Sequence, residues 1–123
     1  MMAVHAKTRK LVKDHLESWN VDDPARRRRL VEATSSTRAR VTSPYGEHSG
    51  TVAQVESIAG VRRAFPKLRC RGRPLGEHHG WVLVSWTTEF GGKRRPLRGI
   101  DVYQVNRKGR ISRIVSFSPV SAL

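Results

Sequence analysis

The fold is decided by residues 97–117, LRGIDVYQVNRKGRISRIVSF, because their period and their turn both predict a β-hairpin. Residues 100–105 alternate between two faces with the two-residue period of a strand. The following NRKG, residues 106–109, has the composition of a turn, and residues 111–117 form a second β-rich run. We therefore expect the rest of the chain to pack around this hairpin.

Asp101 is the unusual residue of the hairpin, because an aspartate in the middle of a strand is a poor β-former. It shares a strand face with Tyr103 and Val105. If that face is the inner one, its apolar surroundings disfavour the charged carboxylate, as is typical of an acid in a ligand pocket. The competing prediction turns Asp101 outward, where it would pair with an arginine such as Arg98 or Arg113.

Two helices are predicted at the start of the chain. Apolar residues recur at helical spacing over 4–19, with His15 on the apolar side. Asp23 followed by Pro24 is typical of a helix start, and this second helix is expected to continue to about Thr34. Two short consecutive helices are expected to pack as an αα-hairpin.

Strands dominate after a third helix. Thr51 and Gln54 match a capping box, which predicts a helix that ends before Pro66. A polar break is expected at 35–37, turns or loops at 43–46, 76–80 and 91–93, and strands at 38–42, 68–75, 81–90, 97–105 and 110–118. Helices followed by a strand meander predict an α+β fold, with the helices on one face of a curved antiparallel sheet that encloses a cone-shaped cavity.

The chain has 123 residues, 37% of them hydrophobic, which predicts one domain over 1–123. No segment approaches the roughly 20 apolar residues of a membrane span, and the start of the chain does not have the pattern of a signal peptide. Cys70 is the one cysteine, so no internal disulfide can form, and this favours a cytoplasmic location. We interpret Cys70 as a small buried side chain rather than a nucleophile.

The net charge of +14 comes from 24 Lys and Arg against 10 Asp and Glu. Such a charge attracts polyanions, but the sequence contains no recognised nucleic-acid motif, so we expect at most weak and non-specific binding of nucleic acid. The tract 77–79, EHH, is a poor metal site, because adjacent histidines of a strand point in opposite directions and no third ligand has motif spacing. We expect neither a metal nor another cofactor.

Five stretches in the same order resemble the SnoaL-like members of the nuclear transport factor 2-like superfamily, which includes ketosteroid isomerases and polyketide cyclases. They are HLESWNVDDPARRRRLVEA, SPYG, Gly50 before the third helix, EHHGWVLVSW and GIDVYQVNRKGRISRIVSF. The resemblance covers nearly the whole chain and implies a cone of three N-terminal helices packed on a curved sheet. It does not by itself imply one function, because this fold hosts several.

The resemblance also implies site residues. Asp101 matches the pocket acid of the isomerases and is the nearest match to the general base of the cyclases, and His15 stands where the isomerases place an oxyanion tyrosine. Ser43 replaces the aspartate that shuttles the proton in the isomerases, and Ile58 replaces a supporting tyrosine. A neutral hydroxyl cannot act as that base, so steroid isomerisation by the family's mechanism is disfavoured. The ligand-binding residues implied are Trp19, Ser43, Tyr45, Ile58, Phe65, Trp86 and Ser116.

Two functions are favoured by the sequence over a third, a nucleic-acid or polyanion binder, which the net charge alone suggests. One is an acid/base enzyme of the cyclase, isomerase or hydrolase type that acts on an apolar or aromatic molecule in an enclosed pocket. The other is a domain of the same fold that binds a small ligand or a protein without catalysis. A cavity reached by both Asp101 and His15 would favour the enzyme, whereas a cavity filled by Trp19, Phe65 and Trp86 would favour the binding domain.

We also expect a homodimer, because Trp81, Leu83, Ile100 and Val102 lie on the outer sheet face.

Overall fold

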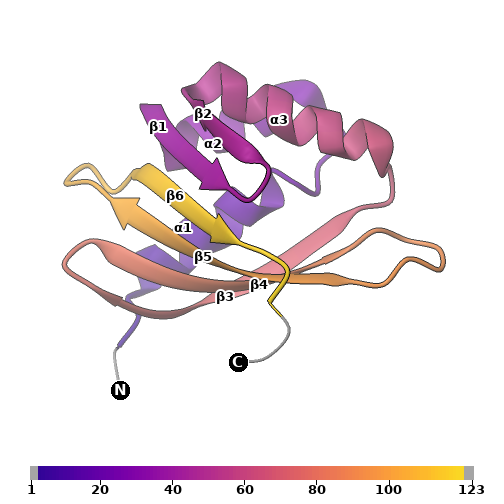
Figure 1. The fold of residues 1–123 in the computed structure, drawn as a ribbon. Helices are drawn as coiled ribbons and strands as arrows, with labels where there is room; N and C mark the ends of the chain where they lie inside the picture. The colour runs from indigo at the N-terminus through magenta and orange to yellow at the C-terminus, as the bar shows by residue number, and fades with distance from the viewer. Residues whose placement is uncertain (1–2, 121–123) are drawn as a thin grey trace.

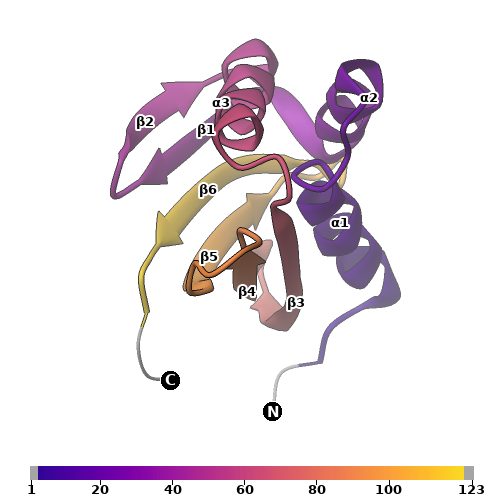
Figure 2. The same ribbon diagram turned by 90° about the vertical axis from the view of Figure 1, so that its right-hand side faces the viewer.

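All three helices lie on the same side of one strongly curved sheet in the computed structural model, which describes residues 3–120 (Figures 1 and 2). The elements follow in the order α1 (Ala6–Glu17), α2 (Pro24–Thr34), β1 (Ser35–Ser43), β2 (Gly46–Ser49), α3 (Thr51–Ala64), β3 (Arg69–His78), β4 (Trp81–Glu89), β5 (Leu97–Val105) and β6 (Ile111–Phe117). This confirms the predicted α+β cone, in which the helices precede most of the strands.

The sheet has six strands in the order β2-β1-β6-β5-β4-β3. The meander from β3 to β6 is antiparallel, as predicted, and so is the β1–β2 hairpin. The pair of β1 and β6 is parallel, however, so the expectation of a purely antiparallel sheet was wrong. The last strand of the meander, β6, lies along β1 and runs in the same direction, with Ser35 opposite Ile111 and Thr42 opposite Val115.

The β5–β6 hairpin has the predicted turn. The side chain of Asn106 accepts hydrogen bonds from the backbone N–H groups of Lys108 and Arg110, and Gly109 takes a φ of +77°. In the resulting register Tyr103 pairs with Ile114, and both are buried. Asp101 lies two residues before Tyr103 and therefore on the inner face of the sheet.

Asp23 caps α2 as predicted, since its side chain accepts from the backbone N–H of Ala25. The predicted capping box of α3 was wrong. Gly50 is the N-cap of α3, without any side-chain hydrogen bond, and Thr51 is already helical. Gln54 is consequently not a capping residue but a buried one, on the inner side of the helix.

Two strand boundaries also differ from the prediction. The expected polar break at 35–37 is absent, because β1 begins directly after α2 with a buried Ser35 that pairs with Ile111 of β6. The short strand β2 was not predicted. At the other end of the sheet β3 continues to His78, and the turn to β4 is a tight one in which His79 and Gly80 both have positive φ.

The hydrophobic core lies between α1 and the inner face of the sheet. Its buried members are Val12, Leu16, Leu68, Cys70, Val82, Val84, Tyr103, Ile111 and Ile114. Above this core, toward α3 and the β1–β2 hairpin, the packing leaves a cavity. Within residues 3–120 no helix has the length and apolar character needed to cross a membrane.

Candidate functional site

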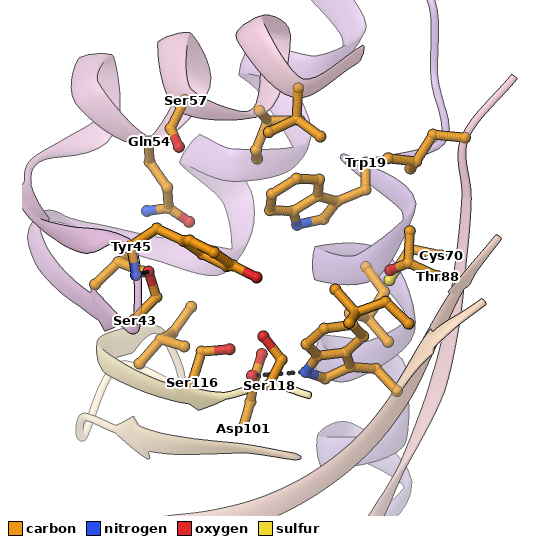
Figure 3. Close-up of a pocket in the computed structure, with 18 of the residues that line it drawn as sticks. Trp19, Ser43, Tyr45, Gln54, Ser57, Cys70, Thr88, Asp101, Ser116 and Ser118 are labelled. Carbon is orange, nitrogen blue, oxygen red and sulfur yellow. Dashed lines mark hydrogen bonds between the residues drawn. The ribbon is translucent and has the colours of Figure 1, made fainter. Parts of the chain in front are cut away.

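The cavity of about 320 Å³ is lined by α1, α3, the β1–β2 hairpin and the inner face of β3–β6 (Figure 3). This volume is at the lower end of the range for small-molecule sites, about 300–1,000 Å³. Eight of the nine residues predicted from the sequence line it, namely His15, Trp19, Ser43, Tyr45, Ile58, Trp86, Asp101 and Ser116. The prediction for Phe65 was wrong: it packs edge-on against Phe90, which does line the cavity, with a centroid distance of 4.7 Å, and the guanidinium group of Arg94 covers its ring at 4.7 Å.

Asp101 lies with its carboxyl group in this cavity and accepts a hydrogen bond of 2.7 Å at Oδ1 from the indole N–H of Trp86. Burial raises the pKa of Asp101, and hydrogen bonds from Ser116 and Trp86 oppose that rise. The ion pairs of residues 3–120 do not include Asp101, so neither Arg98 nor Arg113 holds it at the surface. The carboxyl group is therefore a desolvated acid that forms no ion pair with any of the described residues.

A glycine creates the space in which Trp86 meets Asp101. Gly99 is the cross-strand partner of Trp86, and a Cβ atom at Gly99 would lie 2.1 Å from Cζ2 of the indole. Because no side chain stands there, the indole lies across β5 and its N–H reaches the carboxyl group two residues further along. Gly72 on β3 is the partner of Trp86 on the other side of β4, and a Cβ atom there would clash with the backbone oxygen of Ser85 and with Leu16 of α1.

His15 is buried on α1 and its ring lies edge-on to that of Tyr103, with centroids 5.5 Å apart. Its Nδ1 is 3.1 Å from Oγ1 of Thr34, whose hydroxyl donates to the carbonyl of Leu30. Thr34 thus accepts from Nδ1–H, which leaves Nε2 as the nitrogen with the lone pair. Burial lowers the pKa of His15 to about 4. Neutral His15 is therefore an acceptor at Nε2, and this tautomer cannot supply the oxyanion donor that the resemblance implied.

Gln54 and His48 add polar nitrogens that the sequence analysis missed. Both residues line the cavity, and Nε2 of each is buried without a hydrogen-bond partner among the described residues. The polar residue at position 54 was assigned to a capping box, although its spacing of four from Ile58 places both side chains on one helix face. Burial lowers the pKa of His48, so its imidazole is neutral at neutral pH.

Cys70 and Thr88 lie on another part of the wall (Figure 3). Burial raises the pKa of Cys70 to about 11, so the thiol is protonated at neutral pH and is a poor nucleophile. Within residues 3–120 no three His, Cys, Asp or Glu side chains are grouped to hold a metal ion. Glu77, in the tract considered for metal binding, instead accepts hydrogen bonds from the backbone N–H of His5 and the hydroxyl of Thr8 at the start of α1.

The cavity therefore combines apolar walls, one carboxyl group and several neutral polar groups. None of the described Lys or Arg side chains lines it, although the chain carries a net charge of +14. Such a site can bind a mainly apolar molecule, and the carboxyl group of Asp101, whose pKa is raised by burial, is the acid of the cavity among the described residues.

Comparison with known proteins supports a family assignment. The family model of the SnoaL-like domain matches residues 12–114. A solved structure from Agrobacterium tumefaciens, named as a "putative isomerase of the SnoaL-like family", is 27% identical and superposes with a TM-score of 0.82 over 93% of this chain and 98% of that chain. The curated proteins contain no match.

More distant structures share the fold. A nuclear transport factor 2-like protein from Exiguobacterium is 14% identical, with a TM-score of 0.74 over 90% of this chain and 99% of that chain. A "putative polyketide cyclase" from Sinorhizobium meliloti is 17% identical, with a TM-score of 0.66 over 87% of this chain and 93% of that chain. Because the family model covers most of the sequence, the chain belongs to the SnoaL-like family.

Proposed function

We propose that the cavity binds a small, mainly apolar or aromatic carbonyl compound and that Asp101 transfers a proton on it. The observation that carries this proposal is the position of the Asp101 carboxyl group, which lies inside the cavity on a hydrogen bond from Trp86. A carboxyl group in a ligand cavity with a raised pKa and without a cationic partner is a candidate for acid/base chemistry.

The geometry gives Asp101 a defined orientation. The indole N–H of Trp86 can only donate, so Oδ1 is an acceptor in either protonation state of the acid. The other oxygen is then the one available to a ligand and to Ser116. Desolvation brings the pKa of the carboxyl group closer to neutral pH, where a general acid or base is most effective.

The reaction class that fits one such group is proton transfer at a carbon next to a carbonyl. Asp101 as carboxylate would take the C–H proton, the electron pair would move to the carbonyl oxygen to give an enolate, and the carboxyl group would return the proton to carbon. The names of two similar structures, an isomerase and a polyketide cyclase, support a reaction of this general kind. Ser43 supports a mechanism with one acid/base residue, because its hydroxyl is not a second base.

The second candidate is ligand binding without catalysis, and one observation favours it. His15 is neutral and tied to Thr34, and among the described residues Asp101 is the one carboxyl side chain that lines the cavity. A proton relay would thus have no second charged member. Trp19 and Trp86 form walls of the cavity and do not fill it, which leaves room for a ligand in either case.

The Asp101→Asn variant separates the two candidates. In D₂O the wild-type protein should exchange the methyl protons of 2-acetylnaphthalene for deuterium, as followed by NMR, and Asp101→Asn should reduce the rate at least about 100-fold. Asparagine keeps the shape and accepts from Trp86 but does not titrate. Because Asp101 has no cationic partner, the free energy of unfolding should change by no more than about 1 kcal/mol.

Binding of the same compound, measured by calorimetry, provides the control. If both proteins bind it but neither accelerates exchange, the non-catalytic candidate is correct. If Asp101→Asn exchanges deuterium as fast as the wild-type protein, Asp101 is not the proton-transfer group. If the wild-type protein binds no naphthyl ketone at all, the proposed ligand class is wrong.

A further inference from the structure

A second hollow, of about 500 Å³, lies outside the cavity that contains Asp101. The end of α2, the start of β1 and the turn between β5 and β6 border it, and Figure 1 shows that turn and the start of β1 at the same end of the sheet. We call it the basic hollow, and its lining residues are Glu32, Ser35, Ser36, Thr37, Asn106, Arg107, Lys108 and Arg110. None of them lines the cavity of Asp101, so a site here does not depend on the proposed function.

A bulge in β1 makes room for the basic hollow. The register of β1 against β6 shifts between Ser35 and Arg40, so that four residues of β1 stand opposite one residue of β6. The surplus residues of a bulge stay out of the ladder of backbone hydrogen bonds and bend the strand. Ser36 and Thr37 belong to this bulge and line the hollow, where their hydroxyl groups can donate hydrogen bonds to an anion.

The turn that carries the basic residues is fixed by hydrogen bonds. Oδ1 of Asn106 accepts from the backbone N–H groups of Lys108 and Arg110 at 3.0 and 3.1 Å. The backbone N–H of Asn106 donates to the carbonyl of Arg110, and that of Gly109 donates to the carbonyl of Asn106. A fixed backbone loses less conformational entropy when its side chains bind a ligand. The basic side chains are therefore attached to a preorganised turn.

Three cations of this turn border the hollow, and none of them forms an ion pair with the described residues. Arg107, Lys108 and Arg110 are all exposed. The acidic residue of the lining, Glu32, has its Oε1 3.2 Å from Nε of Arg28 on the same helix. The lining thus has a net charge of +2, and an anion bound among the three cations would relieve their mutual repulsion.

The chemistry of the lining favours phosphate groups that are linked to each other. A guanidinium group binds a phosphate through two parallel N–H bonds, and two arginines offer two such forks, with Lys108 as a third charge. The lining contains no aromatic side chain among the described residues, so it offers no stacking surface for a nucleobase. Three cations on one short turn also form a compact cluster, whereas a nucleic-acid backbone requires an extended basic stripe.

We propose that the basic hollow binds an anion with two linked phosphate groups. Arg107 and Arg110 each bind one phosphate group, and Lys108 neutralises the remaining charge. The hydroxyl groups of Ser36 and Thr37 donate to the outer oxygens. The protein then has a ligand site on its surface that is separate from the cavity of Asp101.

Calorimetry at 0.15 M salt tests the ligand class. Inorganic diphosphate should bind at least about tenfold more tightly than orthophosphate, because it engages both guanidinium groups. Adenosine 5′-diphosphate should bind no more tightly than inorganic diphosphate, because the hollow has no surface for the base. Equal affinities for orthophosphate and diphosphate, or tighter binding of the nucleotide, would overturn the assigned class.

The double variant Arg107→Gln/Arg110→Gln tests the location of the site. It removes both guanidinium groups and should lower the affinity for diphosphate at least about tenfold. The matched control is Lys93→Gln/Arg95→Gln, which removes the same charge from exposed positions between β4 and β5 and should change the affinity by less than about twofold. Equal losses in the two variants would mean that only the net charge of the protein attracts the anion, and would refute the site.

A variant that keeps the charge tests the role of the guanidinium forks. Arg107→Lys/Arg110→Lys should abolish the preference for diphosphate over orthophosphate, because an ammonium group is a point charge without a fork. An unchanged preference would contradict the proposed geometry. Both double variants at the turn keep Asn106 and Gly109, so the melting temperature should not fall. A fall of several degrees would show that the cations stabilise the turn itself and would overturn the proposal.

An oligonucleotide distinguishes the basic hollow from general attraction of polyanions. Decathymidylate should bind Arg107→Gln/Arg110→Gln and Lys93→Gln/Arg95→Gln with equal affinity, because each has lost two positive charges. A selective loss in the variant of the turn would show that the hollow binds a nucleic-acid backbone, and would overturn the proposed diphosphate ligand.

Discussion

Gly99 determines how the acid of the cavity is held. A glycine in a strand interior weakens the strand and often marks the close approach of another group, which here is the indole of Trp86. Gly99 and Asp101 lie on the same face of β5, so the indole covers the glycine and its N–H meets the carboxyl group. The aspartate in the strand predicted an acid in the cavity, whereas the glycine two residues earlier, which makes room for the indole, was not recognised as part of the site.

At the same scale, His15 should make stability depend on pH. The folded protein releases the His15 proton near pH 4, whereas the unfolded chain releases it near 6.5. The unfolded chain therefore binds more protons between these values, so the free energy of unfolding should fall as the pH is lowered from 6.5 to about 4. The expected loss is about 3 kcal/mol, measured by urea unfolding across this range.

The contribution of His15 to the pH dependence of stability is isolated by comparing the wild-type protein with a variant that lacks this histidine. His15→Gln does not titrate, so its profile should be flatter than that of the wild-type protein by the stated amount. His79→Gln, at an exposed histidine, should reproduce the wild-type slope. Asp101 acts in the opposite direction, since an acid with a raised pKa stabilises the fold at low pH and loses that contribution as the pH rises. Both variants retain Asp101, so its effect on the pH dependence of stability cancels in the comparison. If the free energies of unfolding of the wild-type protein and His15→Gln changed in parallel with pH, His15 would not be a buried neutral histidine.

At the scale of helices and strands, the features predicted correctly from the sequence are those that a local sequence pattern encodes. The period of residues 97–117, the Asp23 cap and the helical spacing of α1 are local signals, and the structure confirms each of them. The parallel pairing of β1 with β6 joins segments about seventy residues apart, and no local pattern encodes it. Gln54 was misassigned for the same reason: its sequence neighbours fit a capping box, but the cavity that surrounds it is formed by distant strands.

Arg62 shows how distant elements are joined. Its guanidinium group is buried at the end of α3 and donates to the backbone carbonyls of Trp19, Pro66 and Leu68, and also to Asp22. It therefore links the α1–α2 connection to the start of β3. Because Trp19 forms part of the cavity wall, the same contact positions the site.

Replacement of Arg62 should be costly. Arg62→Met removes the donors from several partly or fully buried carbonyls, so the free energy of unfolding in urea should fall by about 3 kcal/mol. Arg63→Met is the matched control, because Arg63 is the exposed neighbour on the same helix and its loss should cost no more than about 0.5 kcal/mol. Equal effects of the two substitutions would show that the buried network contributes no specific stability.

For the whole molecule, charge and apolar surface are separated in space. The basic residues lie outside the cavity, and the ion pairs found in residues 3–120 engage four of them, Lys10, Arg28, Arg40 and Arg62. The outer face of the sheet, in contrast, carries a row of apolar side chains. Leu83, Val102 and Val115 are direct cross-strand partners, Phe117 is 54% exposed beside them, and Trp81 and Leu83 are each 39% exposed.

We predict that this outer face forms a homodimer, because an apolar row of this kind on a sheet face is a typical interface. Sedimentation equilibrium at tens of micromolar protein should give the dimer mass. Leu83→Lys places a charge in the centre of the row and should give the monomer. Val52→Lys, at an exposed valine of α3, is the control and should leave the dimer intact.

The salt dependence of this dimer should be opposite to that of nucleic-acid binding. Two protomers of charge +14 repel each other, and salt screens this repulsion because the Debye length falls from about 30 Å at 0.01 M to about 8 Å at 0.15 M. Dimerisation should therefore strengthen over this range. Binding of a polyanion releases counterions and should weaken steeply over the same range. A wild-type monomer at 0.15 M salt, or a dimer that survives Leu83→Lys, would contradict the predicted interface.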